Sequence, residues 1–511
     1  MVASTLGGEV LLHMAAIDLG ASSGRLLSAL YDGDQVSLSE VRRFPNRPLH
    51  IFDRMHWNIY ELFQEIKLGL MEARIRSGSM QSLAIDSWAV DFGLLDGTDR
   101  LLELPRHYRD ARNVPAMNAV VTRLGAKQLF SRTGVQLQPF NTIFQLYATL
   151  QHDPSLLKRA DSLLLIPDLL NFFLTGEKRT EFTNATTTQV LGAASGDWDV
   201  DLISTIGVPS EIFTSIAKPG TVLETVHDTE LLTDTSWKGV QVIHTASHDT
   251  ASAVIAATSA AAPYAYISSG TWSLVGTVVP QPIKSELAFE FNFTNEGGLG
   301  NYRLLKNVSG LWLLQETQRI LRQQQQKSDI EYLLREAEYA VPMAFVFDPD
   351  DVRLLLPGNI PATIHRICLE TGQNPPMSVG SLVRGILESL ALKYRIVLEQ
   401  LEGLTGKRYE TVRIVGGGAQ NELLSQFTAN AVKRAVVTGP FEASAMGNVA
   451  VQLFALGHLH TSSEITQLIA QSVQTKCFVP QDHEIWEDAV GRFVRIADVQ
   501  RQHANEEERT S

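Results

Sequence analysis

Apolar and polar residues alternate near the start of the chain, over residues 15–44. Turn residues interrupt the alternation at "GASSG" and again at Asp32-Gly33. A period of two is typical of strands that bury one face. The pattern therefore predicts three consecutive strands joined by short turns, rather than a β-α-β crossover.

A helix and a fourth strand are predicted to follow these three strands. Apolar residues recur at helical spacing over residues 58–78. The apolar run over residues 82–96 predicts a strand, because it ends in the turn signal Asp96-Gly97. The first hundred residues thus read as three strands, a helix and a strand.

The middle of the chain contains one clear helical signal. Residues 163–177 predict a helix that is opened by Pro167 and closed by Gly176. Residues 183–199 are rich in Thr, Gly and Asp, so we expect a loop beside a site there. Residues 262–279 then predict a strand, a turn of Ser and Gly, and a second strand.

The final third has an α/β pattern. Apolar residues at spacings of three and four over residues 383–401 predict a long helix with one apolar face. A buried strand at 411–415, a turn at 416–421 and a helix at 422–432 are predicted next. The polar tail, 501–511, is expected to be frayed. We expect two α/β domains, residues 1–257 and residues 258–511.

Composition narrows the classes of partner. The chain has 511 residues, more than one ordinary hydrophobic core holds, and a formal net charge of −13. That charge argues against a broad basic face for nucleic acid or anionic lipid. No membrane span and no secretory signal are predicted. Only Cys368 and Cys477 are present, without a CxxC pair, which favours a reducing, cytoplasmic setting.

The turn "DLGASSGR", residues 18–25, has the chemistry of a phosphate site. It offers the backbone amides of Ala21 to Gly24 and the hydroxyls of Ser22 and Ser23, and Gly24 would let a ligand approach closely. Arg25 could pair with a terminal phosphate, and Asp18 could hold a divalent cation through water. An ordinary hairpin with Ser at its tip is the alternative interpretation.

Two later turns use similar residues. "SSGTWSL" places Thr271 between two predicted strands, where it could donate to a phosphate or cap the turn. "IVGGGAQNELL" places Gly416, Gly417 and Gly418 between a strand and a helix, with room for a phosphate or a flat ring. No GxxxxGK[ST] loop and no complete GxGxxG fingerprint occur, which disfavours P-loop and Rossmann nucleotide binding.

A candidate general base lies in "ASHDTASAV". Asp249, flanked by His248 and Thr250, could accept the proton of an alcohol as its oxygen attacks phosphorus. An N-cap role is the alternative, and the two roles are compatible. In "IDSWAVDF", Asp86, Trp88 and Asp91 could hold a polyol, although a Trp on a strand is more often part of the core.

Together these stretches resemble the FGGY family of carbohydrate kinases, within the sugar kinase, heat-shock protein 70 and actin superfamily. The resemblance covers nearly the whole chain. The motifs that carry it, in order, are "DLGASSGR", "DSWAVDFGLLD", "YRDAR", "TIFQLYA", "LIPDLLNFFLTGE", "TNATTTQ", "SHDTASAV", "SSGTWSLVG", "TNEGG", "LLKNVSGLWLLQE", "VGGGAQNELLSQFTANA" and "GPFEASAMGN".

The resemblance implies two ribonuclease-H-like α/β domains, each with a mixed five-stranded sheet flanked by helices, and an active site in the cleft between them. It implies ATP-dependent phosphorylation of the 1-hydroxyl of a ketose, with Asp249 as base and Mg²⁺ near Asp18. Sugar would bind mainly to the first domain and ATP to the second. Carried over by position, sugar contacts are His248, Asp249, Thr250 and Asn307, and ATP contacts are Ala21, Ser22, Ser23, Gly24, Arg25, Thr271, Gln315 and Gly417.

One position departs from the pattern. Where a "TWGVDF" motif with Gly lining the sugar pocket is usual, this chain has "SWAVDF", with Ala89 in place of that Gly. L-rhamnulose is the implied ketose, and L-fuculose and L-xylulose are alternatives. A catalytically silent sugar or nucleotide sensor on the same fold is a further alternative. Monomer and homodimer both stay open.

Overall fold

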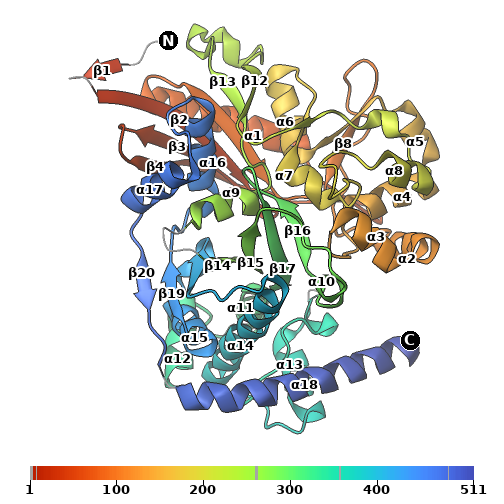
Figure 1. The fold of residues 1–511 in the computed structure, drawn as a ribbon, viewed down its shortest axis with the longest axis vertical. Helices are drawn as coiled ribbons and strands as arrows, with labels where there is room; N and C mark the ends of the chain where they lie inside the picture. Colours follow the sequence, from red (N-terminus) through yellow and green to blue (C-terminus); the bar gives the residue numbers. More distant parts are fainter. Residues whose placement is uncertain (1–3, 7–8, 259–262, 356–357, 482, 511) are drawn as a thin grey trace. The chain divides into compact units, whose positions relative to one another are not determined.

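In a computed structural model, the alternating residues near the start of the chain form an antiparallel meander (Figure 1). Its strands are β2 (Glu9–Leu19), β3 (Ser23–Tyr31) and β4 (Val36–Pro45). The predicted three strands are therefore confirmed. The structure describes residues 4–6, 9–258, 263–355, 358–481 and 483–510.

The described chain divides into two compact units, each built from separate stretches. The first unit comprises Met1–Ala260, Val278–Leu304 and Glu442–Val473, and the second comprises Ala261–Thr277, Leu305–Phe441 and Gln474–Ser511. The sequence suggested one boundary at residue 257, and the assignment of sugar and ATP to the two halves stays a prediction.

The sheet of the first unit is mixed and larger than expected. β7 (Ser82–Ser87) runs parallel to β2, and β13 (Gln241–His244) runs parallel to β7, which completes the five strands that were predicted. Two short strands, β12 (Thr221–Thr225) and β1 (Ser4–Leu6), extend the sheet to seven strands. Runs this short show no clear alternation in the sequence, so they were not predicted.

Helices cover both faces of this sheet. Leu83 and Ile85 of β7 pack in one core with apolar residues of α1 (Ile59–Ser77). The intervening Asp86 points to the opposite face, because side chains alternate along a strand. There it accepts a hydrogen bond of 2.7 Å from Asn448 of α16 (Ala443–Ala455). Helix α9 (Asp249–Ala256) packs against α16 on that face.

The strand predicted over residues 82–96 is broken. β7 ends at Ser87, and β8 (Phe92–Leu95) pairs instead with β9 (Ser162–Leu165) in a separate two-stranded sheet. The break occurs because Val90 adopts a left-handed conformation, with φ of 69°. The chain therefore turns away from the sheet at the end of β7.

The middle segment contains more helix than expected at one point. Residues 183–199 were predicted to form a loop, yet α7 (Phe182–Ala185) and a 3-10 turn over Thr186–Thr188 lie there. The three Thr hydroxyls of the turn donate to carbonyls three residues earlier, which stabilises these short turns. The predicted helix after Pro167 is confirmed as α6 (Ile166–Thr175), with Gly176 in the left-handed conformation as its C-cap.

Other elements complete the first unit. They are β5 (Leu49–Ile51), β6 (Arg54–His56), α2 (Asn113–Leu124), α3 (Ala126–Thr133), α4 (Thr142–His152), α5 (Pro154–Arg159), β10 (Thr180–Glu181), α8 (Val200–Ile206), β11 (Ile216–Ala217), α10 (Glu286–Glu290), β16 (Thr294–Gly297) and α17 (Ser462–Ser472).

The second unit contains the predicted strand-turn-strand and the predicted α/β end of the chain. Its sheet has the order β17-β15-β14-β18-β19-β20. The strands that lie wholly or largely in it are β14 (Tyr264–Ser269), β15 (Trp272–Val279), β17 (Tyr302–Ser309), β18 (Thr411–Val415), β19 (Ala435–Thr438) and β20 (Lys476–Phe478). Its helices are α11 (Trp312–Gln323), α12 (Ile330–Tyr339), α13 (Ile360–Glu370), α14 (Val379–Thr405), α15 (Glu422–Val432) and α18 (His483–Thr510).

The end of the chain was predicted wrongly. The tail was expected to be frayed, but α18 continues to Thr510. The tail is rich in Ala, Glu, Gln and Arg, which are good helix formers, so local propensity favours continuation of the helix.

Among the helices of the described residues, none has a stretch apolar and long enough for a membrane span.

Candidate active site

The turn between β2 and β3 brings Asp18 and Arg25 together. The strand register places the two residues opposite each other, and Nη2 of Arg25 donates to Oδ2 of Asp18 at 2.5 Å. Nη1 of Arg25 donates to Glu442, the residue that precedes α16. The guanidinium predicted to bind phosphate is thus held between two carboxylates of the first unit.

Asn46 holds the tip of this turn in place through two hydrogen bonds. Its side-chain amide donates to the Gly20 carbonyl at 2.9 Å, and its backbone amide donates to the Ser22 carbonyl at 3.0 Å. Ser22 itself is exposed, so its hydroxyl is available to a ligand. Gly24 has a different reason from the predicted one: a Cβ there would lie 2.2 Å from the Phe44 ring.

Asp86 lies beside Asp18 on the neighbouring strand. The parallel register of β2 and β7 pairs these two residues, and Asp86 is fully buried. Burial and then the charge of Asp18 raise the pKa of Asp86 well above its usual range, while the hydrogen bond from Asn448 opposes this. Two carboxyl groups therefore lie side by side at this end of the strands, and the uncharged form of Asp86 is favoured.

His248 and Asp249 form the start of α9, next to the end of β7. The backbone amide of Ser87 donates to the Ser247 carbonyl at 2.9 Å and so attaches the segment to the strand. Asp249 is the first helical residue and not the N-cap that was considered, since His248 occupies the cap position. Burial, followed by the charge of Asp18, raises the pKa of Asp249, although His248 opposes the shift.

The two oxygens of Asp249 have different surroundings. Oδ1 accepts hydrogen bonds from the backbone amide of Thr250 at 2.5 Å and from its hydroxyl at 3.1 Å, and it lies 3.4 Å from Nε2 of His248. The hydrogen bonds that the described residues make to this carboxylate all fall on Oδ1. The side chain is 29% exposed, so Oδ2 can be reached by a ligand.

Glu181, which sequence reasoning missed, anchors the backbone in front of His248. One of its oxygens accepts from the amide of Ser247 at 3.1 Å and from the Ser247 hydroxyl at 2.7 Å. The same carboxylate accepts from Thr183, whose hydroxyl in turn accepts from the amide of His248 at 3.2 Å. The available signal was Glu181 two residues before Thr183 in "EFTNA", but residues 183–199 were interpreted as a loop, and Glu181 was not singled out.

Glu296 and Arg303 were also missed, although Glu296 belongs to the quoted motif "TNEGG". Oε2 of Glu296 lies 3.0 Å from Nη2 of Arg303 and 3.1 Å from Nδ1 of His248. Arg303 is 1% exposed. The buried ion pair of Glu296 and Arg303 therefore lies next to Nδ1 of the His248 imidazole.

Asp91, in the break after β7, holds the indoles of Trp57 and Trp88, and we call these three residues the aromatic anchor. Asp91, 1% exposed, accepts hydrogen bonds from the indoles of Trp57 and Trp88 at 2.6 and 3.0 Å and from Gln145 at 2.9 Å. Burial raises the pKa of Asp91 to about 7, against the effect of these donors. Asp91 therefore binds two indoles, and its contact with a polyol stays a prediction. Ala89 in the same break is only half-buried.

In the second unit, Thr271 and Gln315 come together as predicted ATP contacts. The Thr271 hydroxyl donates to Oε1 of Gln315 at 3.4 Å. The start of α11 is joined to this turn, because Leu311 and Trp312 donate backbone hydrogen bonds to the carbonyls of Gly270 and Thr271.

The triple-glycine turn lies against the end of β14. A Cβ on Gly418 would lie 2.1 Å from the Ser269 hydroxyl, and Gly416 has φ of 82°. A Cβ on Gly417 would meet nothing within 4 Å. Gly417 therefore faces open space at the turn, as an adenosine contact requires. Asn307, predicted to contact sugar, lies on β17 in this second unit.

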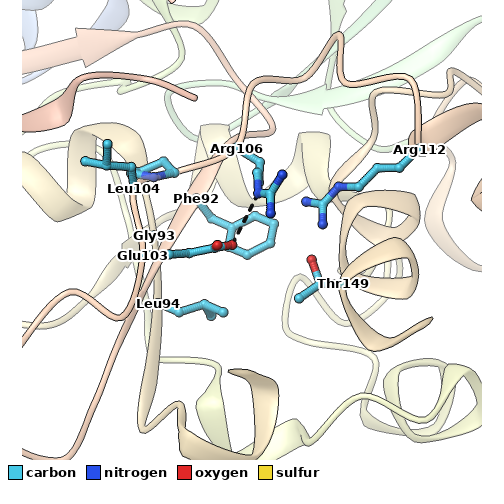
Figure 2. A pocket seen from close by; sticks show the side chains of 9 residues that line it. Phe92, Gly93, Leu94, Glu103, Leu104, Arg106, Arg112 and Thr149 are labelled. Carbon is cyan, nitrogen blue, oxygen red and sulfur yellow. Dashed lines mark hydrogen bonds and ion pairs between the residues drawn. The ribbon is translucent and has the colours of Figure 1, made fainter. Parts of the chain in front are cut away.

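A cavity of the first unit lies apart from these residues (Figure 2). Phe92, Gly93, Leu94 and Thr149 line it together with Arg106 and Arg112. Figure 2 shows the ion pair of Arg106 with Glu103 at its edge. None of the predicted site residues lines this cavity.

Family models match almost the whole chain. The model of the N-terminal domain of the FGGY family of carbohydrate kinases matches residues 13–256, and that of the C-terminal domain matches residues 265–456. This chain belongs to the FGGY family of carbohydrate kinases.

Two curated relatives and one solved structure agree with this assignment. A rhamnulokinase of Bacteroides thetaiotaomicron is 38% identical over 94% of this chain and 98% of its own. A rhamnulokinase of Enterobacter sp. strain 638 is 40% identical over 93% of this chain and 96% of its own. The crystal structure of gluconate kinase from Lactobacillus acidophilus has the same fold, with a TM-score of 0.79 at 16% identity, and covers 98% of this chain and 100% of that one. The FGGY resemblance and the two-domain α/β fold are confirmed.

Proposed function

We propose that this FGGY kinase transfers the γ-phosphoryl group of ATP to the 1-hydroxyl of L-rhamnulose, giving L-rhamnulose 1-phosphate and ADP. The observation that carries the proposal is the carboxylate of Asp249, which keeps one oxygen available at the start of α9. The choice of ketose is supported by the shared name of the two relatives.

Asp249 acts as the general base. Oδ1 already accepts from Thr250, so Oδ2 is the oxygen that takes the proton of the sugar hydroxyl. As this proton leaves, the oxygen of the sugar hydroxyl bonds to the γ-phosphorus, and the bond between that phosphorus and ADP breaks. A base works best when its pKa lies near the operating pH. Burial moves the pKa of Asp249 upward, in that direction.

Predicted phosphate contacts lie in each of the two units. In the first unit, Ser22 and Ser23 offer hydroxyls and Arg25 offers a guanidinium, which stabilises negative charge on the transferring group. In the second unit, Thr271 of the turn between β14 and β15 donates a hydrogen bond to Gln315 of α11, which supports their predicted role with ATP. Gly417, with open space in front of it, supports the adenosine role of the glycine turn.

The residues around Asp18 fit a magnesium ion. Mg²⁺ keeps several waters and needs only one or two carboxylates beside substrate phosphates. Asp18 and Asp86 are register partners, and Oδ1 of Asp86 is buried without a hydrogen-bond partner among the described residues. Asp18 would hold the ion through water, with Asp86 behind it. Bound with ATP, the ion supplies positive charge to the phosphate oxygens.

A panel of ketoses with coupled detection of ADP tests the proposal. L-rhamnulose should give the highest kcat/KM, above L-fuculose and L-xylulose, and ³¹P-¹H correlation spectroscopy should place the phosphate on C1. Preference for another ketose would overturn the named substrate, and no ADP with any ketose would favour the silent sensor.

A pair of variants tests the base. Asp249→Asn should lower kcat by about 100-fold or more, because positioned bases contribute on that scale, while ATP binding is retained. Asp329→Asn is the matched control, since Asp329 caps α12 in the second unit by accepting from the amide of Tyr332. Near-normal kcat in Asp249→Asn would remove Asp249 from this role.

A further inference from the structure

His248 is contacted at both ring nitrogens. Nδ1 lies 3.2 Å from Nη2 of Arg303, within hydrogen-bond distance, and Nε2 lies 3.4 Å from Oδ1 of Asp249. A guanidinium can only donate, and a neutral imidazole carries one proton. Nδ1 also lies 3.1 Å from Oε2 of Glu296, but that oxygen has no hydrogen-bond partner among the described residues. The hydrogen bond with Arg303 therefore uses the lone pair on Nδ1, which leaves the proton of a neutral imidazole on Nε2, on the side of Asp249.

Arg303 is held in place by one hydrogen bond to a carbonyl and one ion pair. Its Nε donates to the Gly297 carbonyl at 2.8 Å, and its Nη2 lies 3.0 Å from Oε2 of Glu296. A guanidinium that is 1% exposed is tolerated only with a paired charge, and Glu296 supplies it. Burial would raise the pKa of Glu296, but the charge of Arg303 lowers it, so the pair is ionised.

The strand that carries Glu296 is fixed against the segment that carries His248. The amide of Gly297 donates to the Thr186 hydroxyl at 2.7 Å, and a Cβ on Gly297 would lie 2.7 Å from the Phe182 ring. Thr183, next to Phe182, accepts from the amide of His248. This close packing sets the distance between the ion pair and the imidazole.

We propose that Arg303, neutralised by Glu296, is a positioning residue that keeps the proton of His248 on Nε2 and so directs it at Oδ1 of Asp249. The inference rests on the proposed role of Asp249 as base. With two donors from Thr250 on Oδ1 and the Nε2 proton of His248 3.4 Å away on the same side, the ionised form of the carboxylate is favoured and oriented, and Oδ2 receives the substrate proton. Without the donor on Nδ1, the proton can move there, and the lone pair of Nε2 would face the carboxylate.

The tautomer can be observed without any activity. In the full-length protein with ¹⁵N-labelled histidine, His248→Gln identifies the His248 signals among those of the 13 histidines. We expect Nδ1 to resonate as an unprotonated nitrogen and Nε2 as a protonated one at neutral pH. A proton on Nδ1, alone or together with one on Nε2, would overturn the proposal, because Glu296 and not Arg303 would then be the partner of that nitrogen.

The kinetics of Arg303→Met provide a second test of this positioning role. Loss of a charge-assisted donor should lower kcat about tenfold or more, with an unchanged KM for ATP. The acidic limb of the kcat profile should move to higher pH, because Asp249 loses the nearby N–H of His248, which favours its ionised form. Other groups that act on this carboxylate, Asp18 of β2, Asp86 of β7 and Tyr108, stay in place.

Arg353→Met is the matched control. Arg353 has a side chain that is 9% exposed and is also paired, with Asp351 and Glu370, but it lies in the second unit. We expect lower stability and an unmoved acidic limb. An unmoved limb in folded Arg303→Met would overturn the proposal, and if that variant does not fold, the tautomer in the unaltered protein decides. If no ketose is phosphorylated, the proposed function is wrong, but the tautomer of His248 can still be measured.

Discussion

Arg25 lies directly across the β2–β3 ladder from Asp18, and its guanidinium is hydrogen-bonded to that carboxylate at 2.5 Å. The other side of the guanidinium is bound by Glu442. A phosphate that recruits Arg25 must compete with both acids. The turn is therefore more than a hairpin tip, and its cation is restrained before any ligand arrives.

Removing one competitor should strengthen ATP binding. In Glu442→Gln we expect the KM for ATP to fall by about 1.5- to 5-fold, the equivalent of a partly exposed ion pair worth about 0.2–1 kcal/mol. Glu442 is 38% exposed, which places the pair in that class. Steady-state kinetics with varied ATP measures the effect.

Glu40→Gln is the control for this prediction. Glu40 pairs with Arg43 on β4 and is similarly exposed, but neither residue contacts Arg25 through a hydrogen bond or ion pair among the described residues. Its KM for ATP should not change. A higher KM in Glu442→Gln would show that Glu442 orients Arg25 for the phosphate and does not compete with it.

Gly447 sets how closely α16 approaches α9. A Cβ at this position would lie 1.8 Å from the Ser252 carbonyl oxygen, so one of the two helices would have to move. Gly447→Ala should lower the free energy of unfolding by about 1–3 kcal/mol or more, as overpacked cores do. Because α9 begins with Asp249, we also expect kcat to fall. Urea unfolding and steady-state kinetics measure the two effects.

Gly403 provides a matched helical glycine. It lies in α14, where a Cβ would meet nothing within 4 Å. Gly403→Ala should raise the free energy of unfolding by about 0.5–1 kcal/mol, because Ala is the better helix former. Equal effects of the two substitutions would contradict the packing argument.

Local signals in the sequence predicted the elements whose ends are marked by local chemistry. Gly176 closes α6 in the left-handed conformation, and α15 begins at the predicted residue because the side chain of Asn421 caps it by accepting from the amide of Leu424. The break at Val90 was not predictable in this way, since a β-branched residue rarely adopts φ of 69° and nothing in "SWAVDF" marks it.

Long-range partners of the site were beyond local patterns for a similar reason. Glu442 lies 417 residues from Arg25, and Arg303 lies 55 residues from His248. A charged side chain shows no periodicity that reveals its partner, so only the fold brings these groups together. Family motifs identified the side chains that would touch substrate, and the buried groups behind them emerged from the structure.

His244 should make the protein sensitive to acid. Its side chain is fully buried, and burial, followed by the charge of Arg179, lowers its pKa to about 3. Below pH 6.5 the unfolded chain binds a proton at His244 that the folded protein does not, so stability is lost as pH falls from 6.5 toward 3. One such proton contributes up to about 1.4 kcal/mol per pH unit.

Urea unfolding of His244→Gln between pH 7 and pH 4.5 tests this. The variant should lose less free energy of unfolding over this range than the unaltered protein. His365→Gln, on the exposed face of α13, should follow the unaltered protein. Equally steep losses in all three would mean that folded His244 is charged, with Asp168, 3.7 Å away, as its partner.

Ala89 should tune the choice of ketose. It lies half-buried in the break after β7, beside the aromatic anchor of Asp91, at the position where Gly is usual in the sugar pocket. Ala89→Gly removes one methyl group, so the ratio of kcat/KM for L-rhamnulose to that for L-fuculose should change by about 10- to 200-fold at most, or about 1–3 kcal/mol. Because the family resemblance places this methyl group next to the sugar and not next to ATP, we expect the KM for ATP to stay the same. The ketose panel measures the ratio, and an unchanged ratio would remove Ala89 from the pocket wall.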